Sequence, residues 1–266
     1  MAQRLPCPNA ANDEELDVLL QGRVAIITGA ARARGIGKAT ARLFAEHGAR
    51  IAILDLEAEA PAATAAEIGP EHLGIDCDVR DKASCGLAVA RVLDWAGRID
   101  VLVNNAGITQ RRATVDITPE DYDLVTDVSL RGTLQMSQSV IPHMRSRRSG
   151  AIVCVSSLSA LQGGGVFGGP HYCAAKAGVL GLARAMAKEL GPDNIRVNAV
   201  APGLTITDFS RSGASDESKD EAARSYPLGR AGRPSEIASV CLFLASELSS
   251  YVTGVTIDVN GGAFIH

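Results

Sequence analysis

Short apolar runs rich in β-branched residues alternate with longer amphipathic segments along this chain of 266 residues. Runs of roughly four to eight such residues are typical of buried strands, and the segments between them are long enough for helices. Strands that alternate with helices form a parallel sheet with helices on both faces and right-handed crossovers. We therefore predict a doubly wound α/β fold with a predominantly parallel, seven-stranded sheet. The predicted strands are 23–28, 50–54, 73–77, 99–104, 150–156, 195–200 and 255–259.

A glycine-rich turn follows the first predicted strand. Gly29 comes directly after this strand, and Gly35, Ile36 and Gly37 open the next helix. Glycines in such a turn let the backbone approach a pyrophosphate, and the amides at the start of the helix favour its negative charge. A glycine cluster alone could be only a flexible turn. However, Asp55 ends the second strand about 20 residues after Gly35, where a ribose-binding carboxylate is expected, so the combination predicts a dinucleotide site.

Tyr172 and Lys176 are one helical turn apart, so both side chains leave the same face of a helix. A phenol ionises near pH ~10, and lowering that value to ~7.5 requires roughly 3 to 4 kcal/mol. One ammonium group at ~4 Å, with an effective dielectric constant of ~20, supplies ~4 kcal/mol. We therefore expect Lys176 to lower the pKa of Tyr172 enough for proton transfer near neutral pH. Two amphipathic residues on a helix surface would be the alternative for the pair alone.

Further motifs in the chain resemble those of the short-chain dehydrogenase/reductase family, from about Gly22 to the carboxyl end. The resemblance implies a Rossmann-type fold and hydride transfer between a nicotinamide dinucleotide and a carbon that bears oxygen. The matching segments are T-G-A-A-R-A-R-G-I-G (28–37), D-V (78–79), N-N-A-G (104–107), S-S (156–157), Y-C-A-A-K (172–176), R-V-N-A-V-A-P-G (196–203) and V-N-G-G (259–262).

The same resemblance implies roles for individual positions. Tyr172 would be the general base or acid, Lys176 would hold the nicotinamide ribose, and Ser157 would bind the substrate oxygen, with Ser156 as the alternative. Asp78 and Val79 would flank the adenine. The implied cofactor-binding residues are Gly29, Arg34, Gly35, Ile36, Gly37, Asp55, Asp78, Val79, Asn105, Gly107, Tyr172, Lys176, Pro202, Gly203, Thr205 and Thr207.

The chain departs from the family pattern at the fourth catalytic position. The family commonly has asparagine in N-L-x-G, whereas this chain reads V-S-L-R-G and places Ser129 there. In the family, the backbone carbonyl at this position helps to hold a water that relays protons to the lysine. Because a backbone group survives the substitution, we expect Ser129 to preserve activity. A second departure is a spacing from Ser157 to Tyr172 that is about two residues longer than usual, with the extra length in a glycine-rich rim, Gly163–Gly169.

The charge at the end of the second strand favours NAD over NADP. Asp55 can accept both ribose hydroxyls, but beside a 2′-phosphate with ~2 negative charges at ~5 Å it would cost at least ~3 kcal/mol, or about a hundredfold in affinity. Arg32 and Arg34 leave an alternative open, because basic residues of this turn bind that phosphate in some related enzymes. The turn has two more residues than is usual in the family, so the direction of both arginines is open.

Composition restricts the class of protein. A hydrophobic content of 46% with 21% charged residues describes a soluble globule, and the net charge of -4 gives no basic field for nucleic acid. No apolar run reaches the ~20 residues that a membrane span needs. Six cysteines without C-x-x-C spacing indicate neither a metal site nor a disulfide framework, and they favour a reducing cytoplasm.

Domain organisation is expected to be simple. Residues 1–21 are interpreted as an extension that is partly disordered or contacts another subunit, and residues 22–266 as a single catalytic domain. The family resemblance implies a homotetramer, and the apolar segment 252–265 is compatible with burial between subunits.

We expect an oxidoreductase that transfers a hydride between NAD and a secondary alcohol or sugar hydroxyl, or that reduces the corresponding ketone. One alternative is an NADPH-dependent ketoreductase that acts on 3-oxoacyl or other carbonyl substrates. Another is a dinucleotide-sensing regulator without turnover, which would not need Tyr172 and Lys176 together.

The substrate is a small molecule that the sequence does not identify. Gln110, Arg111 and Arg112 hint at a polar or anionic substrate. The segment 209–226 resembles the mobile substrate lid of related enzymes. Phe209 and Tyr226, at the two ends of this segment, and Phe167 are candidates for the pocket wall.

Overall fold

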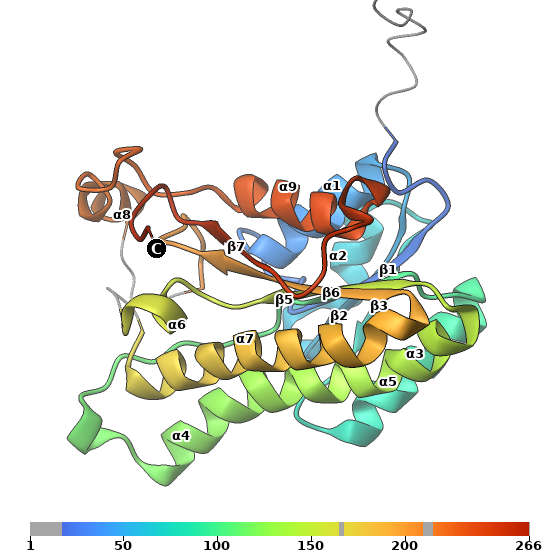
Figure 1. Cartoon of the computed structure of the whole chain (residues 1–266), viewed down its shortest axis with the longest axis horizontal. Helices are drawn as coiled ribbons and strands as arrows, with labels where there is room; N and C mark the ends of the chain where they lie inside the picture. Colours follow the sequence, from blue (N-terminus) through green and yellow to red (C-terminus); the bar gives the residue numbers. More distant parts are fainter. Residues whose placement is uncertain (1–17, 165–167, 210–214, 266) are drawn as a thin grey trace, which may run out of the picture.

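The computed structural model describes residues 18–164, 168–209 and 215–265. All strands of its seven-stranded sheet are parallel, in the order β3-β2-β1-β4-β5-β6-β7 (Figure 1). The chain switches direction across the sheet between β1 and β4, which is where a doubly wound sheet opens a ligand cleft. The strands are β1 Val24–Thr28, β2 Arg50–Asp55, β3 Leu73–Asp76, β4 Val101–Asn104, β5 Gly150–Val155, β6 Ile195–Pro202 and β7 Thr256–Val259.

The predicted α/β fold is confirmed, and every predicted strand is present with ends that differ by one or two residues. The strands form because they are buried on both faces, which requires near-continuous apolar runs. Along β1, for example, Ala25 and Ile27 enter the core on one face, whereas Val24 and Ile26 enter the core on the other.

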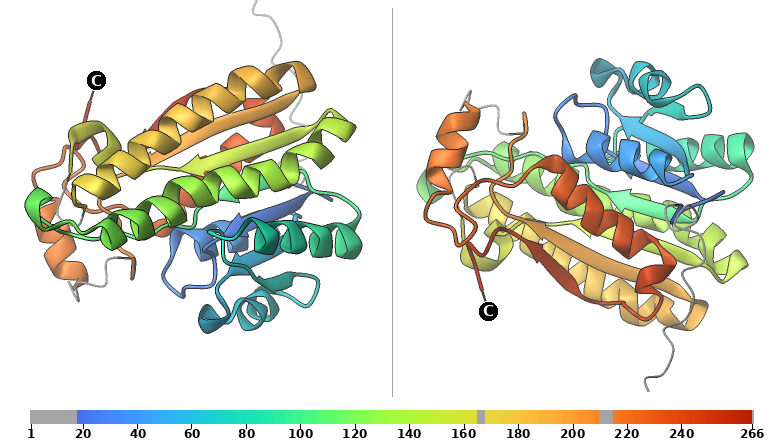
Figure 2. Two further views of the ribbon diagram at one scale, coloured as in Figure 1. Left: turned by 90° about the horizontal axis from the view of Figure 1, so that it is seen from below. Right: turned by 90° about the horizontal axis from the view of Figure 1, so that it is seen from above.

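Two layers of helices cover the sheet (Figure 2). Helices α1, α2 and α9 contribute to one core cluster, and α3, α5 and α7 contribute to the other, so the sheet lies between them. The helices are α1 Ile36–Glu46, α2 Pro61–Ile68, α3 Lys82–Ala96, α4 Pro119–Thr126, α5 Gly132–Arg147, α6 Ser159–Gln162, α7 Pro170–Leu190, α8 Asp216–Ala222 and α9 Pro234–Ala245. In the part of the chain described here, no helix has both the length and the apolar character to cross a membrane.

The folded core begins slightly before the expected domain boundary at residue 22. Leu20 is buried in the same cluster as α1 and α9, and its N–H donates a hydrogen bond to the His47 carbonyl at 2.9 Å. Leu20 therefore belongs to the packed domain, not to the predicted extension. Residues 1–17 of that extension lie outside the described residues.

Candidate active site

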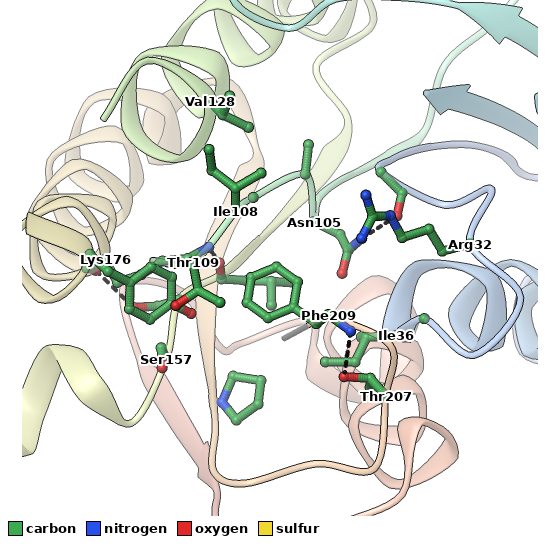
Figure 3. A pocket seen from close by; sticks show the side chains of 18 of the residues that line it. Arg32, Ile36, Asn105, Ile108, Thr109, Val128, Ser157, Lys176, Thr207 and Phe209 are labelled. Carbon is green, nitrogen blue, oxygen red and sulfur yellow. Dashed lines mark hydrogen bonds between the residues drawn. The ribbon is translucent and has the colours of Figure 1, made fainter. Parts of the chain in front are cut away.

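A cavity of about 580 Å³ lies at the carboxyl ends of the strands, and the loops that follow β1 to β6 supply most of its wall. Figure 3 shows Arg32 and Ile36 toward one side of this cavity and Ser157 and Lys176 toward the opposite side, with Phe209 between them. The glycine-rich turn and the tyrosine–lysine pair, which are far apart in the sequence, thus contribute to one elongated site.

Two glycines let the glycine-rich turn pack closely against its neighbours. Gly29 has φ of +63°, a left-handed conformation, and a Cβ at this position would lie 2.7 Å from the Ala106 Cα. A Cβ on Gly37 would lie 2.6 Å from the Gly29 carbonyl oxygen. Gly35 and Ile36, at the start of α1, line the cavity, whereas Gly37 packs behind it. The first amides of α1 are therefore accessible to an anionic group, as a dinucleotide pyrophosphate requires.

Asn105 joins the loops after β1 and β4. Its Nδ2 donates hydrogen bonds to the carbonyls of Thr28 at 2.9 Å and Gly29 at 2.8 Å. In return, the Thr28 hydroxyl accepts from the N–H groups of Asn105 at 3.1 Å and Ala106 at 3.0 Å. Asn105 thereby shapes the turn at the centre of the cleft, and its place in a cofactor site stays a prediction.

Asp55 lines the cavity where a ribose is expected. Its two carboxylate oxygens accept hydrogen bonds from the N–H groups of Ala31 and Leu56, both at 2.9 Å. Burial raises the pKa of Asp55, and the two N–H donors oppose that effect. The carboxylate is thus held by the glycine-rich turn itself.

The two arginines of the turn point in different directions, which settles a question that the sequence left open. Arg32 lines the cavity, and its guanidinium lies 3.1 Å from the Glu59 carboxylate. Arg34 lies outside the cavity wall and pairs instead with Asp216 at 2.5 Å and Asp208 at 3.8 Å. The inclusion of Arg34 among the cofactor-binding residues is therefore not supported, because the longer turn carries it to carboxylates on α8 and on the loop after β6.

Asp78 and Val79 line the cavity after β3, together with Cys77 and Arg80. Arg80 pairs with Asp78 at 2.6 Å, and this hydrogen bond lowers the pKa of the Asp78 carboxyl. The two residues predicted to flank an adenine thus line the cavity together with Asp55, because they follow β3, the strand that pairs with β2.

Tyr172 is 7% exposed and lies near the start of α7. Its phenol shares a hydrogen bond with Ser157, and it packs with Val125 and Ala175 and against Phe209, with ring centroids 6.3 Å apart. Burial in this apolar cluster raises the pKa of Tyr172 to about 12, although the hydrogen bond with Ser157 opposes the rise. The expected decrease in the pKa of Tyr172 is therefore wrong.

Lys176 explains why the expected effect is missing. The side chain is 3% exposed, and its Nζ donates a hydrogen bond to the Val155 carbonyl at 2.8 Å. Burial also lowers the pKa of Lys176 to about 8. The one-turn spacing correctly placed both side chains in the cavity wall, but the burial of both groups outweighs the attraction between an ammonium and a phenolate.

The structure also distinguishes Ser157 from its neighbour. The Ser156 hydroxyl donates to the backbone carbonyl of Lys176 at 2.8 Å and so anchors α7. The Ser157 hydroxyl accepts from the Ser159 N–H at 3.1 Å and bonds the phenol of Tyr172. Of the two serines, Ser156 has its hydroxyl engaged by α7, and the role of Ser157 toward a substrate stays a prediction.

Ser129 is fully buried in a π-helical turn, Asp127–Arg131, between α4 and α5. Its carbonyl accepts a hydrogen bond from Thr133 at 2.8 Å, whereas its hydroxyl has no hydrogen-bond partner among the described residues. A Cβ on Gly107 would lie 3.1 Å from the Lys176 Nζ and 3.6 Å from the Ser129 Oγ. Ser129 is thus close to the lysine, but it lies behind the cavity wall.

The loop after β6 closes the cavity near Tyr172. The predicted residues Pro202, Gly203, Thr205 and Thr207 all line it, and Lys219 on α8 donates to the Thr207 carbonyl at 2.6 Å.

Phe209 and Tyr226, at the ends of the predicted lid, both line the cavity. Residues 210–214 of the lid, and Phe167 in the rim, lie outside the described residues. Gly168, at the described end of the rim, also lines the cavity.

The hint of an anionic substrate is not supported. Gln110 lines the cavity and bonds His171 at 3.1 Å, but neither Arg111 nor Arg112 is part of the wall. Arg112 pairs with Asp121 at 3.0 Å instead. Across the described residues, no group of His, Cys, Asp and Glu side chains could hold a metal ion.

Sequence reasoning missed several residues of the wall. Ile108 and Leu158 directly follow recognised motifs, so their position was a usable signal. Leu124 and Val128 come from α4 and the π-helical turn, and only the packing of these segments near α7 brings them to the cavity.

Comparisons with known proteins show which family the chain resembles along most of its length. A family model described as enoyl-(acyl carrier protein) reductase matches residues 29–263. An uncharacterised short-chain type dehydrogenase/reductase of Sinorhizobium fredii is 53% identical, over 94% of this chain and all of the relative. The 3-oxoacyl-(acyl-carrier-protein) reductase of Thermotoga maritima is 43% identical, over 92% of this chain and 99% of the relative.

A solved structure is also similar. It is the 3-ketoacyl-(acyl-carrier-protein) reductase of Brucella melitensis in complex with NADH, with a TM-score of 0.85 and 33% sequence identity. The match covers 92% of this chain and all of that one.

Proposed function

Because the chain belongs to the short-chain dehydrogenase/reductase family and is an NAD(P)-dependent dehydrogenase or reductase, we propose that it transfers a hydride between NAD(H) and a secondary alcohol or its ketone. One observation carries the proposal. Tyr172 and Ser157 line the same cavity as Asp55 and the start of α1. A dinucleotide that bridges the two ends would bring its reactive ring to the hydroxyl pair.

The charges near Asp55 support NAD(H) over NADP(H). Asp55 and Glu59 both carry negative charge at this end of the cavity, and the cation Arg32 is already paired with Glu59. A 2′-phosphate would therefore meet a site with net negative charge. The NADH complex of the Brucella melitensis relative is in line with this choice.

The residues near Tyr172 support the following division of roles. NAD(H), when bound, supplies the hydride acceptor or donor. Tyr172 is protonated at neutral pH because burial raises its pKa to about 12, so it holds the proton that a ketone oxygen needs during reduction. Ser157 would orient that oxygen by a hydrogen bond, and the charge of Lys176 would stabilise the phenolate that remains.

A more specific candidate is the reduction of a 3-oxoacyl thioester. It is favoured by the similarity to the Thermotoga and Brucella acyl-carrier-protein reductases and by the apolar residues of the cavity wall, which include Ile108, Leu158 and Phe209. Such a wall suits an acyl chain better than a sugar, whose hydroxyls would need polar partners.

The test is steady-state turnover with NADH or NADPH on acetoacetyl-CoA, on secondary alcohols and on sugar alcohols. Tyr172→Phe should abolish turnover on every accepted substrate and leave NADH binding, measured by fluorescence, unchanged. Tyr226→Phe is the matched control, because Tyr226 lines the same cavity and loses the same hydroxyl. Normal turnover by Tyr172→Phe would refute the proposal.

Assembly as a homotetramer belongs to the same proposal. Tyr251, Val255 and Ile265, in or next to the predicted interface segment, are exposed in the single chain. Multi-angle light scattering should give four times the chain mass, and a monomer would contradict this assignment. The cytoplasmic location stays a prediction from composition.

A further inference from the structure

His171 directly precedes Tyr172 on α7, yet its side chain is buried and does not line the cavity. The residue is 2% exposed, and its ring Nε2 lies 3.1 Å from the Oε1 of Gln110, in the loop after β4. Because an amide oxygen can only accept, the ring nitrogen donates this hydrogen bond. A polar residue of the core is thus bonded to a residue that lines the cavity.

The ring of His171 is neutral and carries a single N–H. Burial lowers its pKa, and Arg112 acts in the same direction, whereas Asp121 opposes the shift. These two charged residues pair with each other at 3.0 Å. The proton lies on Nε2, which donates to Gln110, and Nδ1 has no hydrogen-bond partner among the described residues. The bond to Gln110 is therefore the polar contact that orients the ring.

A second contact holds the backbone of the same loop. Gly169, which caps the start of α7, donates its N–H to the Gln110 carbonyl at 2.8 Å. A Cβ at Gly169 would lie 3.0 Å from that carbonyl oxygen and 3.1 Å from the Arg112 nitrogen, so the loop packs directly on the first turn of the helix. Gln110 is thus attached to α7 through both its side chain and its backbone.

The loop held in this way forms part of the cavity wall beside Tyr172. Ile108 and Gln110 both line the cavity, and Ile108 packs against the buried cluster that contains Tyr172. A shift of the loop relative to α7 would change the space between this wall and the phenol. Such shifts matter because a displacement of about 1 Å from the reactive geometry can slow a reaction by about a hundredfold.

We propose that His171 is a positioning residue, which holds the loop after β4 against α7 through Gln110 and so sets the position of the substrate relative to the Tyr172 phenol. The inference rests on the proposed function for the reaction that is positioned. A histidine that only filled space in the core would affect stability alone, and the two roles can be separated.

The experiment compares His171→Leu, which removes the donor, with His171→Gln and His171→Asn. The amide nitrogen of glutamine is the same number of bonds from Cβ as Nε2, whereas that of asparagine is closer to the backbone. On each substrate that the wild type accepts, kcat/KM should fall by about tenfold to a hundredfold in the leucine and asparagine variants and recover in His171→Gln. The Kd for NADH should stay unchanged, and amide exchange of residues 108–112, measured by mass spectrometry, should become faster in the leucine variant only.

His143→Leu is the matched control. The His143 Nε2 accepts a hydrogen bond from the Ile99 N–H at 3.2 Å, just before β4 at the opposite end of the sheet, and His143 does not line the cavity. Its replacement should lower the Tm, as His171→Leu does, and leave kcat/KM unchanged.

A His171→Leu variant with a lower Tm but normal kcat/KM would overturn the proposal, and so would a His171→Gln variant as slow as the leucine variant. A wild type without turnover would refute the proposed function. Unchanged amide exchange of residues 108–112 in His171→Leu would overturn the role of His171 whatever the activity, so the two failures are distinguishable.

Discussion

Asp55→Asn tests the physical basis of cofactor choice, because it removes one negative charge from the cavity and keeps the size of the side chain. The Asp55 carboxylate accepts two backbone N–H groups, and Glu59 already engages Arg32. The variant should therefore accept a 2′-phosphate more readily, with every other charge of this wall unchanged.

The size of the effect follows from Coulomb's law. Two unit charges ~5 Å apart, at an effective dielectric constant of ~20, repel by ~3 kcal/mol, or about a hundredfold. NAD(H) would in addition lose a charged acceptor for its ribose hydroxyls, which contributes roughly 1.5 to 3 kcal/mol per hydrogen bond. The preference for NADPH relative to NADH should rise by at least about a hundredfold.

The assay is the ratio of kcat/KM for NADPH to kcat/KM for NADH, measured on one preparation of each variant. The ratio cancels any loss of folded protein, which matters because an asparagine amide would face an N–H donor and lower the Tm. Asp76→Asn is the control. Asp76 pairs with Asp55 in the sheet register and carries the same charge, but it is exposed and does not line the cavity.

A change in the NADPH to NADH ratio of less than about threefold in Asp55→Asn would refute the electrostatic argument, because the expected change is about a hundredfold. An equal change in Asp76→Asn would show that the overall charge of the surface, and not the charge inside the cavity, decides the choice.

Three further predictions concern residues whose position the structure defines. Arg34→Ala should leave the ratio of NADPH to NADH activity unchanged, because Arg34 lies outside the cavity. Arg32→Ala should lower this ratio, because Arg32 lines the cavity. The reverse pattern in steady-state kinetics would contradict the assignment of the two arginines. Lys176 should raise the free energy of unfolding by about 2 kcal/mol as the pH rises from about 7.5 to 9.5. The reason is that the folded ammonium, with a pKa of about 8, loses its proton in that window while the unfolded lysine keeps it. Urea unfolding should show the gain in the wild type and not in Lys176→Met, and an identical pH dependence of both would be evidence against a depressed pKa. Ser129→Asn places the residue common in the family next to Lys176 and should change turnover or its pH profile; if both stay the same, the position is not part of a proton relay.

The sequence was sufficient for the fold and for most of the cavity wall, for a physical reason. Parallel strands buried on both faces require continuous apolar runs, and the residues that follow those runs meet at one edge of the sheet. Asp55 ends a strand, and Asn105 and Ser157 follow strands within two positions, so their place was determined once the strands were recognised.

Features that depend on distant partners were beyond such reasoning. The direction of Arg34 is determined by Asp216, which lies 182 positions away in the chain. The pKa of Tyr172 depends on burial by residues such as Val125 and Phe209, from other parts of the chain, and not on its spacing from Lys176. Local spacing identifies which groups are neighbours, but it does not show how much water the fold removes from them.

The contacts of Asn105 have a consequence for the energetics of ligand capture. Four hydrogen bonds connect it and Ala106 to the end of β1 without the help of any ligand. A loop that has to become ordered on binding loses about 1 to 2 kcal/mol per residue in backbone entropy. The loop of Asn105 and Ala106 is already ordered, so it avoids that loss. Replacement of Asn105 would therefore weaken the affinity for a ligand, because the loop would become mobile and would have to be ordered on binding. This would hold even if the Asn105 side chain did not contact the ligand.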